Sequence, residues 1–248
     1  MLLVVVPLLF SCLPKKPEIP GTEVPAGPIV QALEQQRRSF TALKAIASIE
    51  VVRQGKRRMF DTVGVVLDAQ RRFRVEAVGP LGLPIITLVW DGTEIVLRLP
   101  DDRIMKPGQA GIERILGLGV EARELCAVLS GTVTEIDRPA DARAYCVQDG
   151  VCVVELPAGD LVRRVHVLFS AAPAPAVRIV AQELYRSDRL LYRARYERAE
   201  ETAHGPLPRT IIIENPEKKA MLTVEYAEAD VNVPVADDAF TLGDGNSR

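Results

Sequence analysis

The chain has 248 residues, a formal net charge of −2, an apolar content of 48% and only 5% aromatic residues. This length suits one large domain or two small ones, and the lack of a basic excess argues against a nucleic-acid partner.

The N-terminal residues MLLVVVPLLFSC join an apolar run, Leu2 to Ser11, to a cysteine at position 12. The run is shorter than the roughly 20 residues that span a bilayer, and it has the length of the apolar part of a signal peptide. The last four residues, Leu9 to Cys12, resemble a bacterial lipobox. This resemblance implies removal of residues 1–11 as a lipoprotein signal peptide and lipidation of Cys12 by diacylglycerol and an N-acyl chain. An ordinary secretory signal with a chance cysteine is the alternative.

The segment LPKKPEIPGTEVPAGP, residues 13–28, is rich in proline and has no apolar periodicity. Such a composition cannot bury a core and indicates an extended linker. We therefore expect residues 12–28 to be a lipidated tether and residues 29–248 to be the folded domain. No later segment is apolar enough to cross a membrane, so the lipid would be the anchor.

The folded domain is expected to start with a helix, because Ile29, Leu33, Phe40, Leu43 and Ala47 recur at helical intervals. They predict an amphipathic helix of roughly 18 residues that needs a partner surface.

Beyond this helix the apolar period changes to two, which is typical of antiparallel strands with one solvated face. The predicted strands span residues 46–53, 58–68, 71–78, 84–90, 93–99, 102–106, 132–137, 143–148, 151–156, 161–169, 177–186, 189–199, 208–214 and 219–228, some of which are expected to merge or fail.

One segment, residues 110–130, interrupts the strand pattern. It reads as two short helices separated by Gly117-Leu118-Gly119, and an insert of this kind usually covers an open end or face of a sheet. Cys126 lies in its second apolar stripe and is expected to be a buried thiol.

Cys146 and Cys152 flank an Asp-Gly turn between two β-branched runs. A hairpin there would set the two cysteines opposite each other. In an oxidising compartment they could form a cross-strand disulfide, and unpaired thiols are the alternative. A metal site is much less favoured, because the spacing is not that of a zinc motif and no histidine is near.

The order of these elements, together with the segment Arg72 to Pro84 (RFRVEAVGPLGLP), resembles the LolA/LolB family, which comprises the periplasmic carrier and the outer-membrane receptor of lipoprotein sorting. In LolB-type sequences a polar strand runs into a Pro-Leu-Gly turn and then into another strand. The resemblance implies a mainly β (α+β) fold, an incomplete antiparallel β-barrel of about 11 strands with an N-terminal helix and a helical lid insert. This chain departs from the pattern at Gly82-Leu83-Pro84, where polar residues are usual, and in its Cys146/Cys152 pair.

The resemblance assigns functions to particular residues. Leu81 matches the family's protruding leucine, which assists transfer of lipoproteins into the membrane, and Leu83 would enlarge that apolar tip; a buried turn leucine is the alternative. An apolar cavity on the concave face of the sheet could take acyl chains, whereas a solid core would leave no such space. Candidate lining residues are Phe73, Val75, Ile86, Leu88, Trp90, Ile95, Leu97, Met105, Leu116, Leu125 and Leu129.

The lipobox favours a LolB-like protein that faces the periplasm from the outer membrane over a soluble carrier. Its expected partners are acyl chains of lipoproteins or other lipids, a soluble LolA-like carrier and the membrane, and it is expected to be a monomer with no cofactor besides the covalent lipid. A LolA-like structural or scaffold lipoprotein without transfer activity is the alternative.

No catalytic residue and no metal site is predicted from the sequence. The two histidines, His166 and His204, have no partner at ligand spacing, and no nucleophile elbow, phosphate loop or zinc-protease motif occurs. Arg163 and Arg164 are expected on solvated rims of a strand. The function is therefore expected to be binding rather than catalysis.

Overall fold

The computed structural model describes residues 18–108, 111–147, 150–171, 175–202 and 205–242. Within these ranges, 14 strands form one antiparallel sheet in the order β1-β8-β9-β10-β11-β12-β13-β14-β2-β3-β4-β5-β6-β7. The strands are β1 (Thr22–Val24), β2 (Ala42–Arg53), β3 (Lys56–Asp68), β4 (Phe73–Val78), β5 (Pro84–Trp90), β6 (Ile95–Arg98), β7 (Ile104–Met105), β8 (Arg143–Cys146), β9 (Val151–Ala158), β10 (Leu161–Ser170), β11 (Ala176–Arg186), β12 (Arg189–Thr202), β13 (Gly205–Asn215) and β14 (Ala220–Val231).

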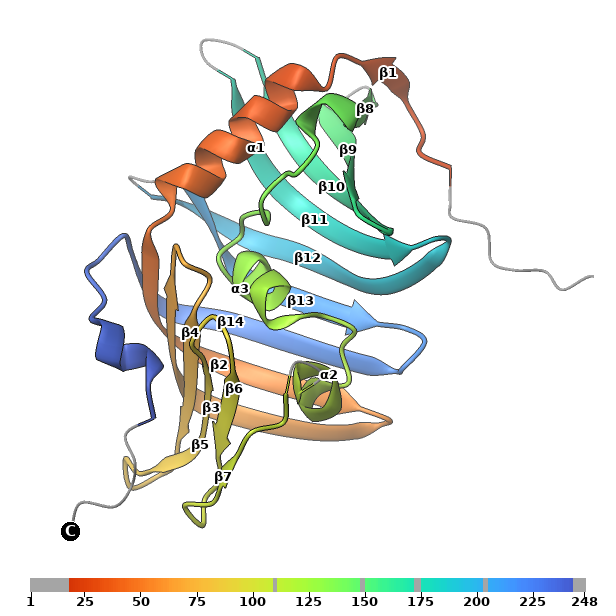
Figure 1. Ribbon diagram of the computed structural model, residues 1–248. Helices are drawn as coiled ribbons and strands as arrows, with labels where there is room; N and C mark the ends of the chain where they lie inside the picture. The colour runs from red at the N-terminus through yellow and green to blue at the C-terminus, as the bar shows by residue number, and fades with distance from the viewer. Residues whose placement is uncertain (1–17, 109–110, 148–149, 172–174, 203–204, 243–248) are drawn as a thin grey trace, which may run out of the picture.

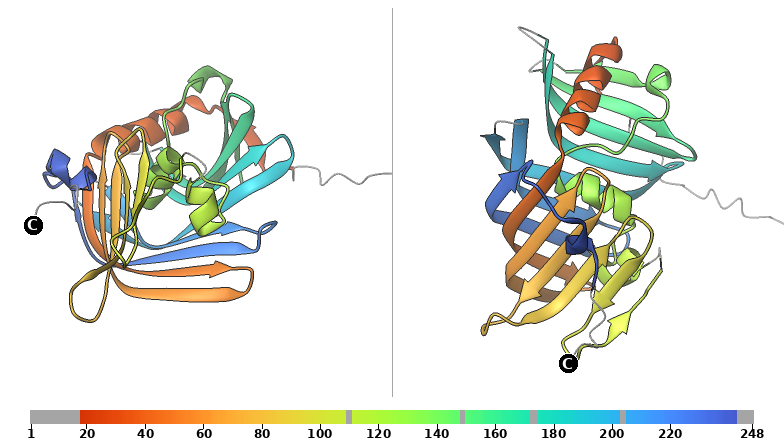
Figure 2. Two further views of the ribbon diagram at one scale, coloured as in Figure 1. Left: turned by 60° about the horizontal axis from the view of Figure 1, so that its bottom comes forward. Right: turned by 60° about the vertical axis from the view of Figure 1, so that its left-hand side comes forward.

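The three α-helices of the described residues lie on the concave side of this curved sheet (Figures 1 and 2). They are α1 (Gly27–Ser39), α2 (Gly111–Leu116) and α3 (Ala122–Leu129), and two short 3-10 turns are η1 (Pro139–Asp141) and η2 (Asp237–Phe240). The fold prediction is confirmed: the chain is mainly antiparallel β, with an N-terminal helix and a short helical insert. No helix in the described part of the chain is long and apolar enough to cross a membrane.

The concave face carries two apolar cores. Helix α1 packs its buried side chains, among them Ile29 and Leu33, against strands β8 to β11. The larger core lies between α2, α3 and the strands from β12 through β14 to β6. Registers shift within β2/β3 and β14/β2, between Ala47 and Ile49 and between Tyr226 and Glu228, and irregularities of this kind bend strands and help a sheet to curve.

Helix α1 is shorter than its apolar pattern predicts. It ends at Ser39, and Phe40 already has extended backbone angles, so Leu43 and Ala47 are core residues of strand β2 and not of a helix. The prediction was wrong here because residues four apart lie on one face of a helix and equally on one face of a strand.

Two further segments differ from the prediction. Residues 132–137 form no strand, and two of their backbone carbonyls accept hydrogen bonds from side chains: Gln182 donates to the Thr132 carbonyl (2.8 Å) and Arg71 to the Val133 carbonyl (2.9 Å). At the N-terminus, β1 lies inside the segment predicted as a tether and pairs with β8. The part of residues 12–28 left for an extended linker therefore ends before Thr22.

The antiparallel order gathers six turns at one end of the sheet, which we call the turn end. These are the turns at residues 54–55, 79–83, 99–103, 159–160, 187–188 and 216–219. Because the sheet twists, this end sweeps from the right of Figure 1, at β9 and β10, to the bottom, at β5 and β7.

Candidate functional site

An apolar cavity of about 340 Å³ lies between the concave face of the sheet and the helices of the insert. Strands β2 to β6 and β14 form its walls, and α2 and α3 cover it. Its volume is near the lower end of the roughly 300–1,000 Å³ typical of small-molecule sites, so it has room for one extended apolar chain. The lining side chains are Ile49, Val51, Arg53, Gln54, Lys56, Arg58, Phe60, Val63, Val65, Val75, Ala77, Ile86, Leu88, Leu97, Ile115, Leu116, Leu125, Leu129, Leu222 and Val224.

Most of the lining residues expected from the sequence do line this cavity, namely Val75, Ile86, Leu88, Leu97, Leu116, Leu125 and Leu129. The other four do not. Phe73 is fully buried in the solid part of the core, and Trp90 and Ile95 line a separate depression of about 860 Å³ on the other side of the insert. Met105 lies exposed on the short edge strand β7. Alternation of apolar and polar residues predicts which face of a strand is buried. It does not predict which part of that face lines the cavity.

Sequence reasoning missed the contribution of β2, β3 and β14. The ladder places Val51 opposite Leu222 and Ile49 opposite Val224, and all four side chains line the cavity. The alternation of these strands was visible in the sequence. Their adjacency was not, because β14 and β2 are far apart in the chain.

Helix α3 is held to the sheet by a buried ion pair. Arg163 on β10 donates two hydrogen bonds to Glu124, at 3.1 and 2.8 Å, and the Tyr192 hydroxyl donates to the same carboxylate at 2.7 Å. Burial alone would lower the pKa of Arg163, but Glu124 and Tyr192 hold it above its ordinary value. The expectation of a solvated Arg163 was therefore wrong, and Arg164, buried beside Glu155, is a second such case.

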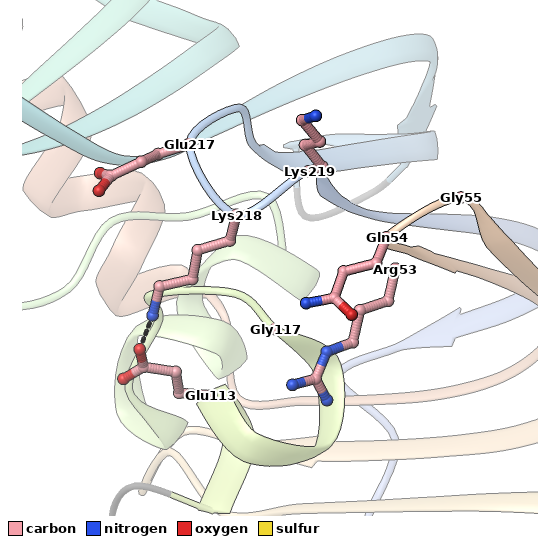
Figure 3. A pocket seen from close by; sticks show the side chains of 8 residues that line it. All are labelled: Arg53, Gln54, Gly55, Glu113, Gly117, Glu217, Lys218 and Lys219. Atoms are coloured by element: carbon pink, nitrogen blue, oxygen red, sulfur yellow. Dashed lines mark ion pairs between the residues drawn. The ribbon is translucent and has the colours of Figure 1, made fainter.

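Helix α2 is held differently, by contacts at the surface. Lys218, in the turn before β14, forms an ion pair with Glu113, and Figure 3 shows the Arg53 side chain reaching toward Gly117 at the end of α2. A Cβ atom on Gly117 would come within 3.3 Å of Arg53, so the guanidinium arm packs against this end of the helix. The apolar face of α2 turns Ile115 and Leu116 into the cavity.

The mouth of the cavity is polar and opens at the turn end of the sheet. Arg53 and Gln54 line both the apolar cavity and an adjoining depression of about 810 Å³, whose other walls include Lys218 and Lys219 (Figure 3). Lys56 and Arg58 line the cavity beside them. The site thus combines an apolar interior with a charged entrance.

Leu81 and Leu83 lie at the turn end, in the turn between β4 and β5. Their side chains are 87% and 66% exposed. The Gly79 amide donates to the Leu83 carbonyl at 2.9 Å and the Gly82 amide to the Gly79 carbonyl at 3.0 Å. Gly82 has a φ of +73°, a conformation that residues with a Cβ rarely adopt. The turn therefore holds two apolar side chains away from the core.

The cysteines lie apart from the cavity mouth. Cys146 and Cys152 face each other across the β8/β9 ladder and form a disulfide, with their Cα atoms 4.0 Å apart. Cys126 is fully buried in α3, and burial raises the pKa of its thiol to about 12. Cys12 and His204 lie outside the described residues, and within the described residues no three His, Cys, Asp or Glu side chains gather as a metal site would require.

Comparison by sequence identifies no relative: no protein-family model matches the chain, and no curated protein matches it.

Comparison by structure finds similar folds at low sequence identity. A protein of the DUF1329 family from Desulfovibrio piger is 11% identical, with a TM-score of 0.58 over 86% of this chain and 97% of its own. A domain named as an outer membrane lipoprotein-sorting protein from Vibrio parahaemolyticus is 10% identical, with a TM-score of 0.59 over 85% and 95%. A LolA superfamily protein from Nitrosomonas europaea is 14% identical, with a TM-score of 0.50 over 86% and 96%. The chain has a LolA-like fold.

Proposed function

We propose that this protein is a lipid-anchored envelope protein that binds acyl chains in the cavity under α2 and α3. In this role it is LolB-like: it receives lipoproteins from a soluble carrier and passes them to the outer membrane. The observation that carries the proposal is the apolar cavity beneath the helical insert. Burial of a hydrocarbon chain is non-directional and scales with apolar area, so such a lining suits an acyl chain without directed polar contacts.

Two features support an envelope location. The sequence Leu9 to Cys12 resembles a lipobox, and the Cys146–Cys152 disulfide suits an oxidising compartment such as the periplasm. We expect mass spectrometry of the mature protein to find diacylglycerol and an N-acyl chain on Cys12. An unmodified Cys12, or an intact Met1, would contradict the anchor.

Binding of an acyl chain can be tested by filling the cavity. Val51 lines it, whereas the next residue of β2, Val52, points to the opposite face of the sheet and is about as buried. We expect Val51→Trp to weaken binding of a fluorescent fatty acid at least about tenfold, since the indole occupies space that the chain needs. Val52→Trp is the matched control and should bind as the unaltered protein does.

The measurement is a fluorescence titration of each variant, with circular dichroism to confirm that both are folded. Equal affinity of the two tryptophan variants would place the binding site elsewhere. If the unaltered protein binds neither the fatty acid nor a triacylated lipopeptide, the proposal is wrong and an envelope scaffold becomes the better description.

A further inference from the structure

Five basic residues surround the mouth of the cavity, and we call them the basic rim: Arg53, Lys56, Arg58, Lys218 and Lys219. The first three come from the hairpin of β2 and β3, and the lysines at 218 and 219 from the turn before β14. Arg53 lines the polar depression (Figure 3), and it also lines the apolar cavity. A ligand that leaves the cavity through its mouth therefore meets this rim.

The strand register concentrates positive charge on the cavity side of the hairpin. Arg53 is paired directly with Lys56, and Arg58 is opposite Val51 in the next pair on the same face, two pairs further along the ladder. Like charges directly opposite in a sheet are destabilising. On the outer face of the same hairpin the positive charge is paired, because Arg57 forms an ion pair with Glu50 at 2.6 Å.

The carboxylates at the mouth are already engaged. Glu113 pairs with Lys218, and Glu217 forms two hydrogen bonds with Arg189, each 2.6 Å long. In the described part of the chain, no ion pair involves Lys56, Arg58 or Lys219. The entrance therefore keeps an excess of positive charge beside an apolar wall, where the field of a charge is stronger than in open water.

We infer that the site selects lipids with an anionic phosphate headgroup, whose chain fills the cavity while the phosphate binds the basic rim. This inference rests on the proposed binding of an acyl chain and names the class of lipid bound; it does not rest on the transfer of lipoproteins, because their acylated cysteine carries no phosphate. Arginine presents a planar fork of donors that matches phosphate oxygens, and lysine adds a compact charge. The depression of about 810 Å³ next to the cavity gives the headgroup room outside the apolar interior.

The test compares ligands that differ only in the headgroup. Lysophosphatidic acid and monoacylglycerol of equal chain length are titrated into the full protein, with glycerol 3-phosphate as a headgroup without a chain. We expect lysophosphatidic acid to bind about tenfold more tightly than monoacylglycerol, and the difference to shrink in 0.5 M salt because exposed charges are screened.

Two neighbouring arginines provide matched variants. Arg58→Gln removes a charge from the basic rim. We expect it to reduce the ratio of the affinity for lysophosphatidic acid to that for monoacylglycerol about threefold to fivefold. Arg57→Gln removes the same charge from the outer face and should leave the preference unchanged. The preference is taken as the ratio of the two affinities within each variant, so that a general loss of binding at the cavity wall does not count toward it.

The results of these titrations distinguish the headgroup inference from the proposed binding of an acyl chain. Equal affinity for the two lipids, or equal effects of the two variants, would overturn the headgroup inference and leave acyl-chain binding standing. Glycerol 3-phosphate binding as tightly as lysophosphatidic acid would also overturn it, since the rim would then be a site for free phosphate. Binding of neither lipid would contradict the proposed function itself.

Discussion

A cluster of charged side chains on the outer face of β10 to β12 centres on Glu183. Its carboxylate accepts hydrogen bonds from Arg193 at 2.7 Å and Tyr185 at 2.9 Å, and His166 Nε2 lies 3.6 Å away. Burial alone would raise the pKa of Glu183, but contacts with His166, Arg193 and Tyr185 lower it to about 2. The cluster is therefore a structural tie between strands.

The depressed pKa makes stability depend on acid pH. An unfolded glutamate titrates near 4.5, so the stabilisation by Glu183 is present above that pH and is lost as pH falls toward about 2. We expect this group to contribute about 3 kcal/mol to the free energy of unfolding at pH 7. Glu183→Gln should therefore be destabilised at pH 7 and should show a flatter profile between pH 5 and pH 2.

Urea unfolding at a series of pH values measures this effect. Glu197→Gln, which changes an exposed carboxylate on β12, is the control and should keep the slope of the unaltered protein. Parallel profiles for Glu183→Gln and the unaltered protein would show that the carboxylate has the same pKa in the folded and unfolded chain.

The strands were the elements best predicted from the sequence. The alternation in segments such as 161–169 and 189–199 marked strands β10 and β12 correctly, and their ends shifted by a few residues at most. Period-two alternation with one solvated face identifies a strand without tertiary information. The start of β2 was missed, because Leu43 and Ala47 fit a helical and an extended pattern equally well.

The candidate site was predicted only in part, because it is built from residues that are distant in the sequence. Leu125 and Leu129 could be assigned to a lid because α3 has a local apolar stripe. Val51 and Leu222 could not be assigned to a shared wall, because only the β14/β2 ladder brings them together. The burial of Arg163 was likewise invisible, since its partner Glu124 comes from a helix far from it in sequence.

At the scale of the whole molecule, the turn end of the sheet unites the mouth of the cavity with the exposed turn of Leu81 and Leu83. The topology places both at the same end, and the next hairpin adds exposed Ile104 and Met105. An end that carries both exposed apolar turns and basic side chains suits contact with an anionic membrane surface. We therefore expect lipid to be exchanged at this end.

Replacing the apolar tip with a charge tests this orientation. Leu81→Glu should leave folding and fatty-acid binding intact and slow the transfer of bound lipoprotein into vesicles about tenfold, because a carboxylate resists entering the membrane interface. Met59→Glu changes an exposed apolar residue on the outer face of β3 and is the control. Transfer can be followed with a fluorescent lipopeptide, and an unchanged rate for Leu81→Glu would exclude a role for this turn.

The pairing of β14 with β2 also sets the order in which the protein can fold. Leu43 near the start of the domain is opposite Val231 near its end, so this ladder closes a loop of almost the whole domain, and contacts of such separation form slowly. Strands β3 to β6 can pair as successive hairpins beforehand, but β14 supplies Leu222 and Val224 to the cavity wall. The cavity is therefore incomplete until the segment up to residue 224 has paired with β2, and no ligand can be enclosed before that point.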